Sequence, residues 1–109
     1  MLRLTTSVLV LSAAAALSAC AKGPDSIAPV SMGNAFAAMD CRQAAGDLQV
    51  ARQNVETLSS AQRGAVAGDA IGVFLLGIPV GSLTGGDKAG ELGAEKGKVL
   101  ALEARMRSC

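Results

Sequence analysis

A heptad pattern that starts at Cys41 strongly limits how this chain can fold. Steps of three and four residues from Cys41 meet, in order, Ala44, Leu48, Ala51, Val55, Leu58, Gln62 and Ala65, of which only Gln62 is polar. The same stepping backward from Cys109 meets Met106, Leu102, Val99, Glu95, Leu92 and Lys88. Stripes of this kind are typical of helices that pack side by side. The two cysteines therefore bracket a predicted pair of helices.

Residues 1–19 have the features of a secretory signal peptide. Arg3 supplies a short positive region, and residues 4–17 form a largely apolar run that ends in small side chains. The run is too short and wrongly flanked for a stable membrane span. The sequence Leu17-Ser18-Ala19-Cys20 then resembles the lipobox of bacterial lipoproteins, in which cleavage precedes the cysteine.

The lipobox resemblance implies that Cys20 carries a diacylglyceryl group and, after cleavage, an acylated amino group. Fatty acyl chains such as palmitate contribute ~0.8 kcal/mol per buried CH₂, so several chains hold a protein on a bilayer far better than one. Ala21 and Lys22 follow Cys20 in place of an aspartate. In the family this implies the periplasmic leaflet of the outer membrane rather than the inner membrane.

Export would leave Cys41 and Cys109 in an oxidising compartment, where they are expected to form a disulfide. That bond would close a loop of about 70 residues, which stabilises a domain by roughly 4 kcal/mol. If the two cysteines face each other in an antiparallel pair, the residue numbers of facing positions sum to 150. The facing pairs are then Ala44–Met106, Leu48–Leu102, Ala51–Val99, Val55–Glu95 and Leu58–Leu92. The predicted fold is all-α, an antiparallel, coiled-coil-like two-helix hairpin with the disulfide at its base.

The predicted boundaries follow from composition and from capping residues. They are a signal peptide at 1–19, a lipidated N-terminus and flexible linker at 20–39, and a hairpin at 40–109 with helices at 41–63 and 87–108 and an apolar, glycine-rich turn region at 64–86. Asp40, with Gln43 three residues on, fits the N-cap and capping box of the first helix, and Asp87 fits a cap for the second. The linker holds two prolines and is expected to lift the folded part off the lipid surface.

Residues 70–83 form an uncharged run at the predicted turn, at the far end from the disulfide. A single membrane-spanning helix needs ~20 residues, and Pro79 would break or kink a helix here. Glycines recur around this run at a spacing that lets helix backbones approach closely, at Gly64, Gly68, Gly72, Gly77, Gly81 and Gly85.

Three interpretations of this run stay open. It can form a compact turn with its own small core, a tip that inserts shallowly into a membrane or a partner's groove, or a glycine-zipper hairpin within a bilayer. The tip residues expected to make membrane or partner contact are Val73, Phe74, Leu75, Leu76 and Ile78.

A second set of small residues lies on the second predicted helix, on the face opposite the heptad stripe that packs against the first helix. It consists of Gly86, Gly90, Gly93, Gly97, Ala101 and Ala104. Each interior glycine costs ~1 kcal/mol relative to alanine. Such a smooth face could receive another helix, which predicts weak self-association. The alternative is simply low helical stability in the first turns.

The mature chain also resembles a group of small proteobacterial lipoproteins of the helical-hairpin type. The shared layout is the lipidated Cys20, a proline-containing tether with Pro24 and Pro29, the helix start Asp40-Cys41, an apolar middle with Pro79, the restart Gly85-Gly86-Asp87, and the terminal Cys109. The group's middle segment is richer in aromatic residues, whereas this chain has only Phe74 there. The resemblance implies a place in the cell envelope, and it implies no biochemical activity for this chain.

The reactive side chains argue against catalysis and against ligand binding. The chain has no histidine, which removes the usual general base and the commonest metal ligand. Ten basic and nine acidic side chains leave no basic excess for nucleic acid. The sequence also lacks a CxxC motif, a nucleophile–base pair and a P-loop. We therefore expect no enzyme activity, catalytic residue, metal site, cofactor, nucleic-acid partner or small-molecule substrate.

Two functional hypotheses follow. In the first, a lipid-anchored protein of the cell envelope has a structural or protein-interaction role and presents its tip or its glycine face to an envelope protein. In the second, a membrane-inserting hairpin of the glycine-zipper type affects the packing of the envelope.

Overall fold

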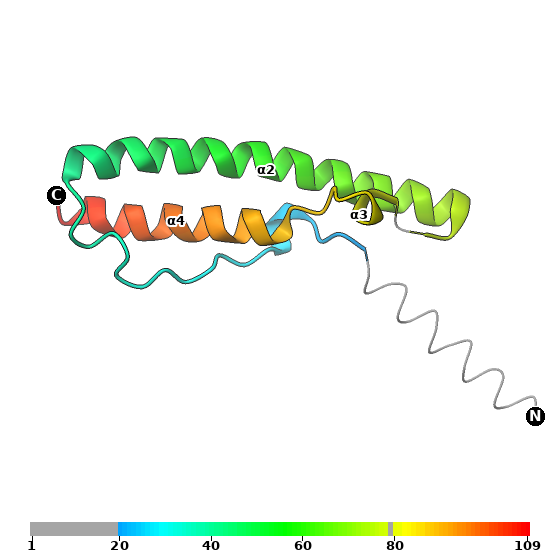
Figure 1. Cartoon of the computed structure of the whole chain (residues 1–109), viewed down its shortest axis with the longest axis horizontal. Coiled ribbons are helices and arrows are strands. Elements are labelled where there is room, and N and C mark those ends of the chain that lie inside the picture. Colours follow the sequence, from blue (N-terminus) through cyan, green and yellow to red (C-terminus); the bar gives the residue numbers. More distant parts are fainter. Residues whose placement is uncertain (1–19, 79) are drawn as a thin grey trace, which may run out of the picture.

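The structure, a computed structural model, describes residues 20–78 and 80–109. The predicted signal peptide at 1–19 lies outside the described residues. Within them the order of elements is a short 3-10 helix η1 (Pro24–Ser26), the long helix α2 (Cys41–Leu76), the short helix α3 (Val80–Leu83) and helix α4 (Ala89–Arg107), and this part of the chain holds no strand. Helices α2 and α4 lie antiparallel and side by side, which confirms the predicted all-α hairpin (Figure 1).

The hairpin has the register that its two cysteines predict. Cys41 and Cys109 form a disulfide with their Cα atoms 6.0 Å apart. The core beside the disulfide is made of Ala44, Leu48, Ala51 and Leu102, with Phe36, Met39, Val99 and Met106 packed against it. At the other end of α4, the backbone N–H of Lys88 donates to Gln62 Oε1 at 2.6 Å, and this pair again sums to 150. One register therefore holds over the whole length of α4.

Helix α2 starts where the sequence predicts and ends later. Asp40 is its N-cap, and Oδ1 of Asp40 accepts from the backbone N–H groups of Arg42 at 3.0 Å and Gln43 at 3.2 Å. The helix runs past residue 63 to Leu76, because its heptad stripe continues to Asp69 and Gly72, which are both buried.

The helix ends at Gly77. Its φ of 74° lies in the left-handed region, and its N–H donates to the carbonyl of Val73 at 3.1 Å. This is a common way for a glycine to terminate a helix. The turn region that the sequence places at 64–86 is therefore shorter in the structure, and its first part belongs to α2.

The glycines of the turn allow α3 to pack closely on α2. A Cβ atom built on Gly81 would lie 2.5 Å from the carbonyl oxygen of Ala65, and one built on Gly68 would lie 3.4 Å from the Cα of Gly81. The four-residue glycine spacing thus serves a contact within one chain. Helix α4 then starts close to the predicted position, because Asp87 Oδ1 accepts from the N–H of Ala89 at 3.0 Å.

Residues 20–39 pack along the hairpin, which differs from the flexible linker that the sequence predicts. In Figure 1 this blue-to-cyan segment follows α4 towards the start of α2. Lys96 Nζ donates to the carbonyl oxygens of Pro24 and, at 2.9 Å, Ile27, and the side chain of Ile27 is buried. A cation that satisfies two carbonyl groups holds an irregular segment in place without regular secondary structure.

The glycine face of α4 receives this segment. The N–H of Val30 donates to the carbonyl of Gly93 at 2.9 Å, and a Cβ built on Gly97 would lie 1.9 Å from the carbonyl oxygen of Val30. Only a residue without a Cβ permits such an approach. This corrects the expectation that the face receives another helix in self-association, since its centre is covered by the chain's own residues 28–30.

Candidate functional site

The most distinctive surface feature is a group of exposed apolar side chains at the free end of α2. We call this group the apolar tip, and it consists of Ile71, Val73, Phe74, Leu75, Leu76 and Ile78. Phe74 is 87% exposed, Leu75 68% and Leu76 69%. A single exposed leucine is ordinary, whereas a cluster of exposed apolar side chains marks a contact surface.

The structure brings the predicted tip residues together, because all of them lie in the last turn of α2 or directly after it. The structure adds Ile71, one turn earlier, which is not among the predicted contact residues. The sequence feature that indicates a contact role for Ile71 is its place in the uncharged run 70–83.

A buried carboxylate lies just before the tip. Asp69 is 1% exposed, and its oxygens accept from the N–H of Ala21 at 2.6 Å, from the N–H of Ser82 at 2.7 Å and from the Ser82 hydroxyl. The side chain thereby joins three segments, namely the N-terminal segment, α2 and α3. This role is not predicted above from the sequence, although Asp69 lies on the continued heptad stripe, where a charged side chain needs partners.

These donors keep Asp69 ionised despite its burial. The hydrogen bond from the Ser82 hydroxyl is the largest cause that lowers the pKa of Asp69 below its usual value of 3.8. The backbone N–H groups of Ala21, Ser82 and Gly81 act in the same direction, while burial acts against them. Donors that bind the charged form of a carboxylate stabilise that form.

Gln62 makes a second polar junction two turns earlier in α2. It is 0% exposed, and its Nε2 donates to the carbonyl of Lys22 at 2.8 Å and to Asp87 Oδ1 at 2.9 Å. With the Lys88 contact described above, all of its polar atoms are used. Gln62 is the one polar residue in the heptad pattern that starts at Cys41. The structure explains why it is polar, because its side chain joins the N-terminal segment to the start of α4.

These junctions fix the position of Cys20, the predicted lipidation site. Cys20 is a free, partly buried cysteine, and the next residue, Ala21, is buried against α2. Figure 1 shows the described chain starting beside α3, at the end of the molecule that carries the apolar tip. The disulfide lies at the opposite end.

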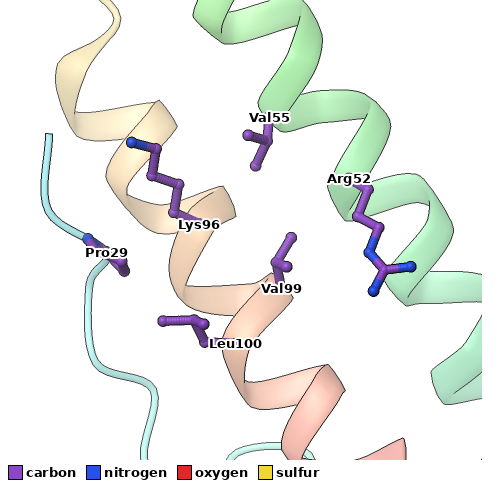
Figure 2. Close-up of a pocket in the computed structure, with 6 residues that line it drawn as sticks. All are labelled: Pro29, Arg52, Val55, Lys96, Val99 and Leu100. Carbon is purple, nitrogen blue, oxygen red and sulfur yellow. The ribbon is translucent and has the colours of Figure 1, made fainter. Parts of the chain in front are cut away.

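A shallow groove of about 230 Å³ lies midway along the hairpin (Figure 2). Its lining comes from three segments, with Pro29 from the N-terminal segment, Arg52 and Val55 from α2, and Lys96, Val99 and Leu100 from α4. Both cationic side chains at its edge are already engaged. Lys96 binds the two carbonyl groups described above, and Arg52 forms an ion pair with Glu103 at 3.1 Å. The groove therefore lacks convergent polar groups that could orient a small ligand.

The described residues contain neither a membrane-spanning helix nor a metal-binding cluster. None of the helices within 20–78 and 80–109 is long and apolar enough to cross a bilayer. The same residues contain no group of three or more side chains arranged to hold a metal ion. Comparison of the chain with models of protein families, with curated proteins and with solved structures found no match.

Proposed function

We propose that this chain is a lipid-anchored protein of the bacterial cell envelope, with a structural or protein-interaction role and without catalytic activity. The observation that carries the proposal is the place of Cys20 in the fold. Cys20 is free and only partly buried, and the residue that follows it, Ala21, is buried in the fold. A chain cleaved before Cys20 would keep every contact described above and would present its first residue at the surface for acylation.

The shape supports a structural role. Helix α2 has 36 residues, which corresponds to a length of about 54 Å at 1.5 Å per residue. The disulfide closes one end of the hairpin, and the Gln62 and Asp69 junctions fasten the other. A rod held at both ends is suited to keep a binding surface at a set distance from a membrane.

A second candidate, a membrane-inserting hairpin that affects envelope packing, is favoured by the exposed apolar tip. Full burial of a large apolar side chain contributes roughly 1.5–3 kcal/mol. The turn glycines are engaged with each other inside one chain, as for Gly68 and Gly81, so insertion would involve the tip rather than a glycine zipper along the hairpin.

The proposal is tested by the mass of the mature protein made in a Gram-negative host. We expect a chain that starts at Cys20 and carries the added mass of the acyl chains, and that partitions into detergent. The control Cys20→Ser should lack the added mass and should remain in the aqueous phase. A mature wild-type protein without acyl groups would contradict the proposal.

Liposome flotation of the Cys20→Ser chain separates the two candidates. Flotation that is lost on Leu75→Asp supports membrane insertion by the tip. If the unlipidated chain stays at the bottom of the gradient, the apolar tip has too little affinity for lipid to act alone, which supports the structural or protein-interaction role.

A further inference from the structure

The anchor residue and the apolar tip lie at the same end of the rod. The N–H of Ala21 donates to Asp69 Oδ2 at 2.6 Å, which fixes the residue after Cys20 to the last quarter of α2. From Asp69 the helix continues for seven residues to Leu76, or about 10 Å. The segment expected to act as a flexible tether would have allowed the tip to point in any direction, and its packing removes that freedom.

The surface beyond Cys20 carries no charge that would have to leave water. Residues 70–83 are uncharged, and the charge that precedes them, Asp69, is buried and hydrogen-bonded within the fold. The next exposed charge along α2 in the direction of the disulfide is Arg63. On the anchor side, the exposed Lys22 lies two residues after Cys20, where a cation suits anionic headgroups.

The geometry points to one occupant of the apolar tip, namely the lipid leaflet that holds the acyl chains of Cys20. This inference rests on the proposed lipid anchor. The acyl chains bring the end of α2 to the membrane surface, the tip side chains enter the interface, and the disulfide end points away from the membrane. The protein is then attached to the bilayer at two points, one covalent and one through the tip.

The dimensions fit shallow insertion. Apolar side chains of interfacial helices reach about 5–10 Å into the boundary between headgroups and acyl chains. The tip extends about 10 Å beyond Asp69 and ends in a helical turn whose last N–H, that of Gly77, is bonded to Val73. Because the N–H groups of this last turn are bonded within the helix, moving its backbone from bulk water into the interface costs less than it would for an irregular segment.

The absence of tryptophan and tyrosine from the chain allows a clean test. We would introduce a single tryptophan as Phe74→Trp at the tip, or as Val50→Trp in the control, a position exposed on the same helix about 36 Å away. The full acylated protein is purified from membranes and placed in vesicles of phosphatidylethanolamine and phosphatidylglycerol whose acyl chains carry bromine close to the headgroup. Bromine quenches tryptophan only at short range.

We expect the Phe74→Trp protein to lose most of its fluorescence in brominated vesicles. Its emission should also lie at a shorter wavelength than the emission of a tryptophan that is exposed to water. The Val50→Trp protein should keep its intensity. Adding Leu75→Asp to Phe74→Trp should restore the fluorescence, while flotation with the vesicles persists through the acyl chains.

Two results would overturn the inference. Unquenched emission at long wavelength from Phe74→Trp would place the tip in water, and unquenched emission at short wavelength would place it against protein, either a second copy or another chain. Mass analysis of the same samples keeps the two proposals apart. Acylated protein with an unquenched tip refutes the inference alone, whereas absence of acyl groups refutes the proposed anchor.

Discussion

The close contact between Gly97 and the N-terminal segment makes Gly97→Ala a sensitive test of the fold. The new methyl group would lie 1.9 Å from the carbonyl oxygen of Val30, far inside any allowed contact. The helix cannot yield there, so residues 28–30 must leave the face of α4. The substitution would therefore release a segment that the sequence alone predicts to be free.

The expected loss is calculated from three contributions. The hydrogen bond from Val30 to Gly93 contributes about 1 kcal/mol. Exposure of the buried Ile27 side chain costs roughly 1.5–3 kcal/mol. Alanine favours the helix by ~1 kcal/mol over glycine. The net loss is about 1.5–3 kcal/mol, which lowers the Tm of a domain of this size by roughly 6–24 °C.

Thermal unfolding followed by circular dichroism, on the mature chain with Cys20→Ser, measures this loss. The matched control is Gly46→Ala, a glycine inside α2 with nothing within 4 Å of a built Cβ atom. The control should raise the Tm, because only the helix preference acts. If Gly97→Ala raised the Tm as Gly46→Ala does, residues 28–30 would not lie on α4 and the account of the N-terminal segment would be wrong.

Three further predictions concern the ends of the hairpin and the buried polar side chains. Cys109→Ser should lower the free energy of unfolding in urea by roughly 4 kcal/mol, and an unchanged midpoint would contradict a disulfide that closes the domain. Gln62→Leu leaves part-buried backbone groups without their partner and should cost about 1–3 kcal/mol in the same assay, whereas the exposed Gln53→Leu should change it by less than about 0.5 kcal/mol. Because the pKa of Asp69 is lowered in the folded state, its contribution is present above its usual value of 3.8 and is lost as the pH falls through the lower folded value. The free energy of unfolding should therefore fall less steeply with decreasing pH in Asp69→Asn than in the wild type. Equal slopes would show that Asp69 does not act in this way.

The register of the hairpin was accessible from sequence because few residues determine it. Cys41 and Cys109 fix one pair of facing positions, and the heptad spacing carries that alignment along both helices. The contact between Gln62 and Lys88 shows that it extends to the start of α4. A pattern of apolar side chains at fixed spacing reports directly on which face of a helix is buried.

The packing of residues 20–39 was not accessible in the same way. Its composition of prolines and small polar residues is typical of a linker. The contacts that hold it are made to backbone carbonyl groups by Lys96 and to the bare surface of Gly93 and Gly97, and such contacts leave no periodic signal in the segment itself. The glycines of α4 were visible as a smooth face, but the sequence could not say which chain covers it.

Asp69 illustrates the remaining gap. Its charge lies within the glycine-rich region, where the sequence alone gives no sign of the partners that the fold supplies. Ala21 and Ser82 are distant from Asp69 in sequence, so their hydrogen bonds depend on how α3 and the N-terminal segment close on α2. The position of the anchor relative to the tip follows from this closure.

Neutron reflectometry of the acylated protein on a supported bilayer tests the central claim, that the anchor and the tip share one end of a rigid rod. With about 10 Å of the 54 Å helix in the interface, the account predicts protein density that extends about 45 Å into the water, together with density among the headgroups. A layer only about 20 Å thick would show a rod lying flat on the membrane, since each helix is about 10 Å across. That result, or a layer with no density among the headgroups, would contradict the account.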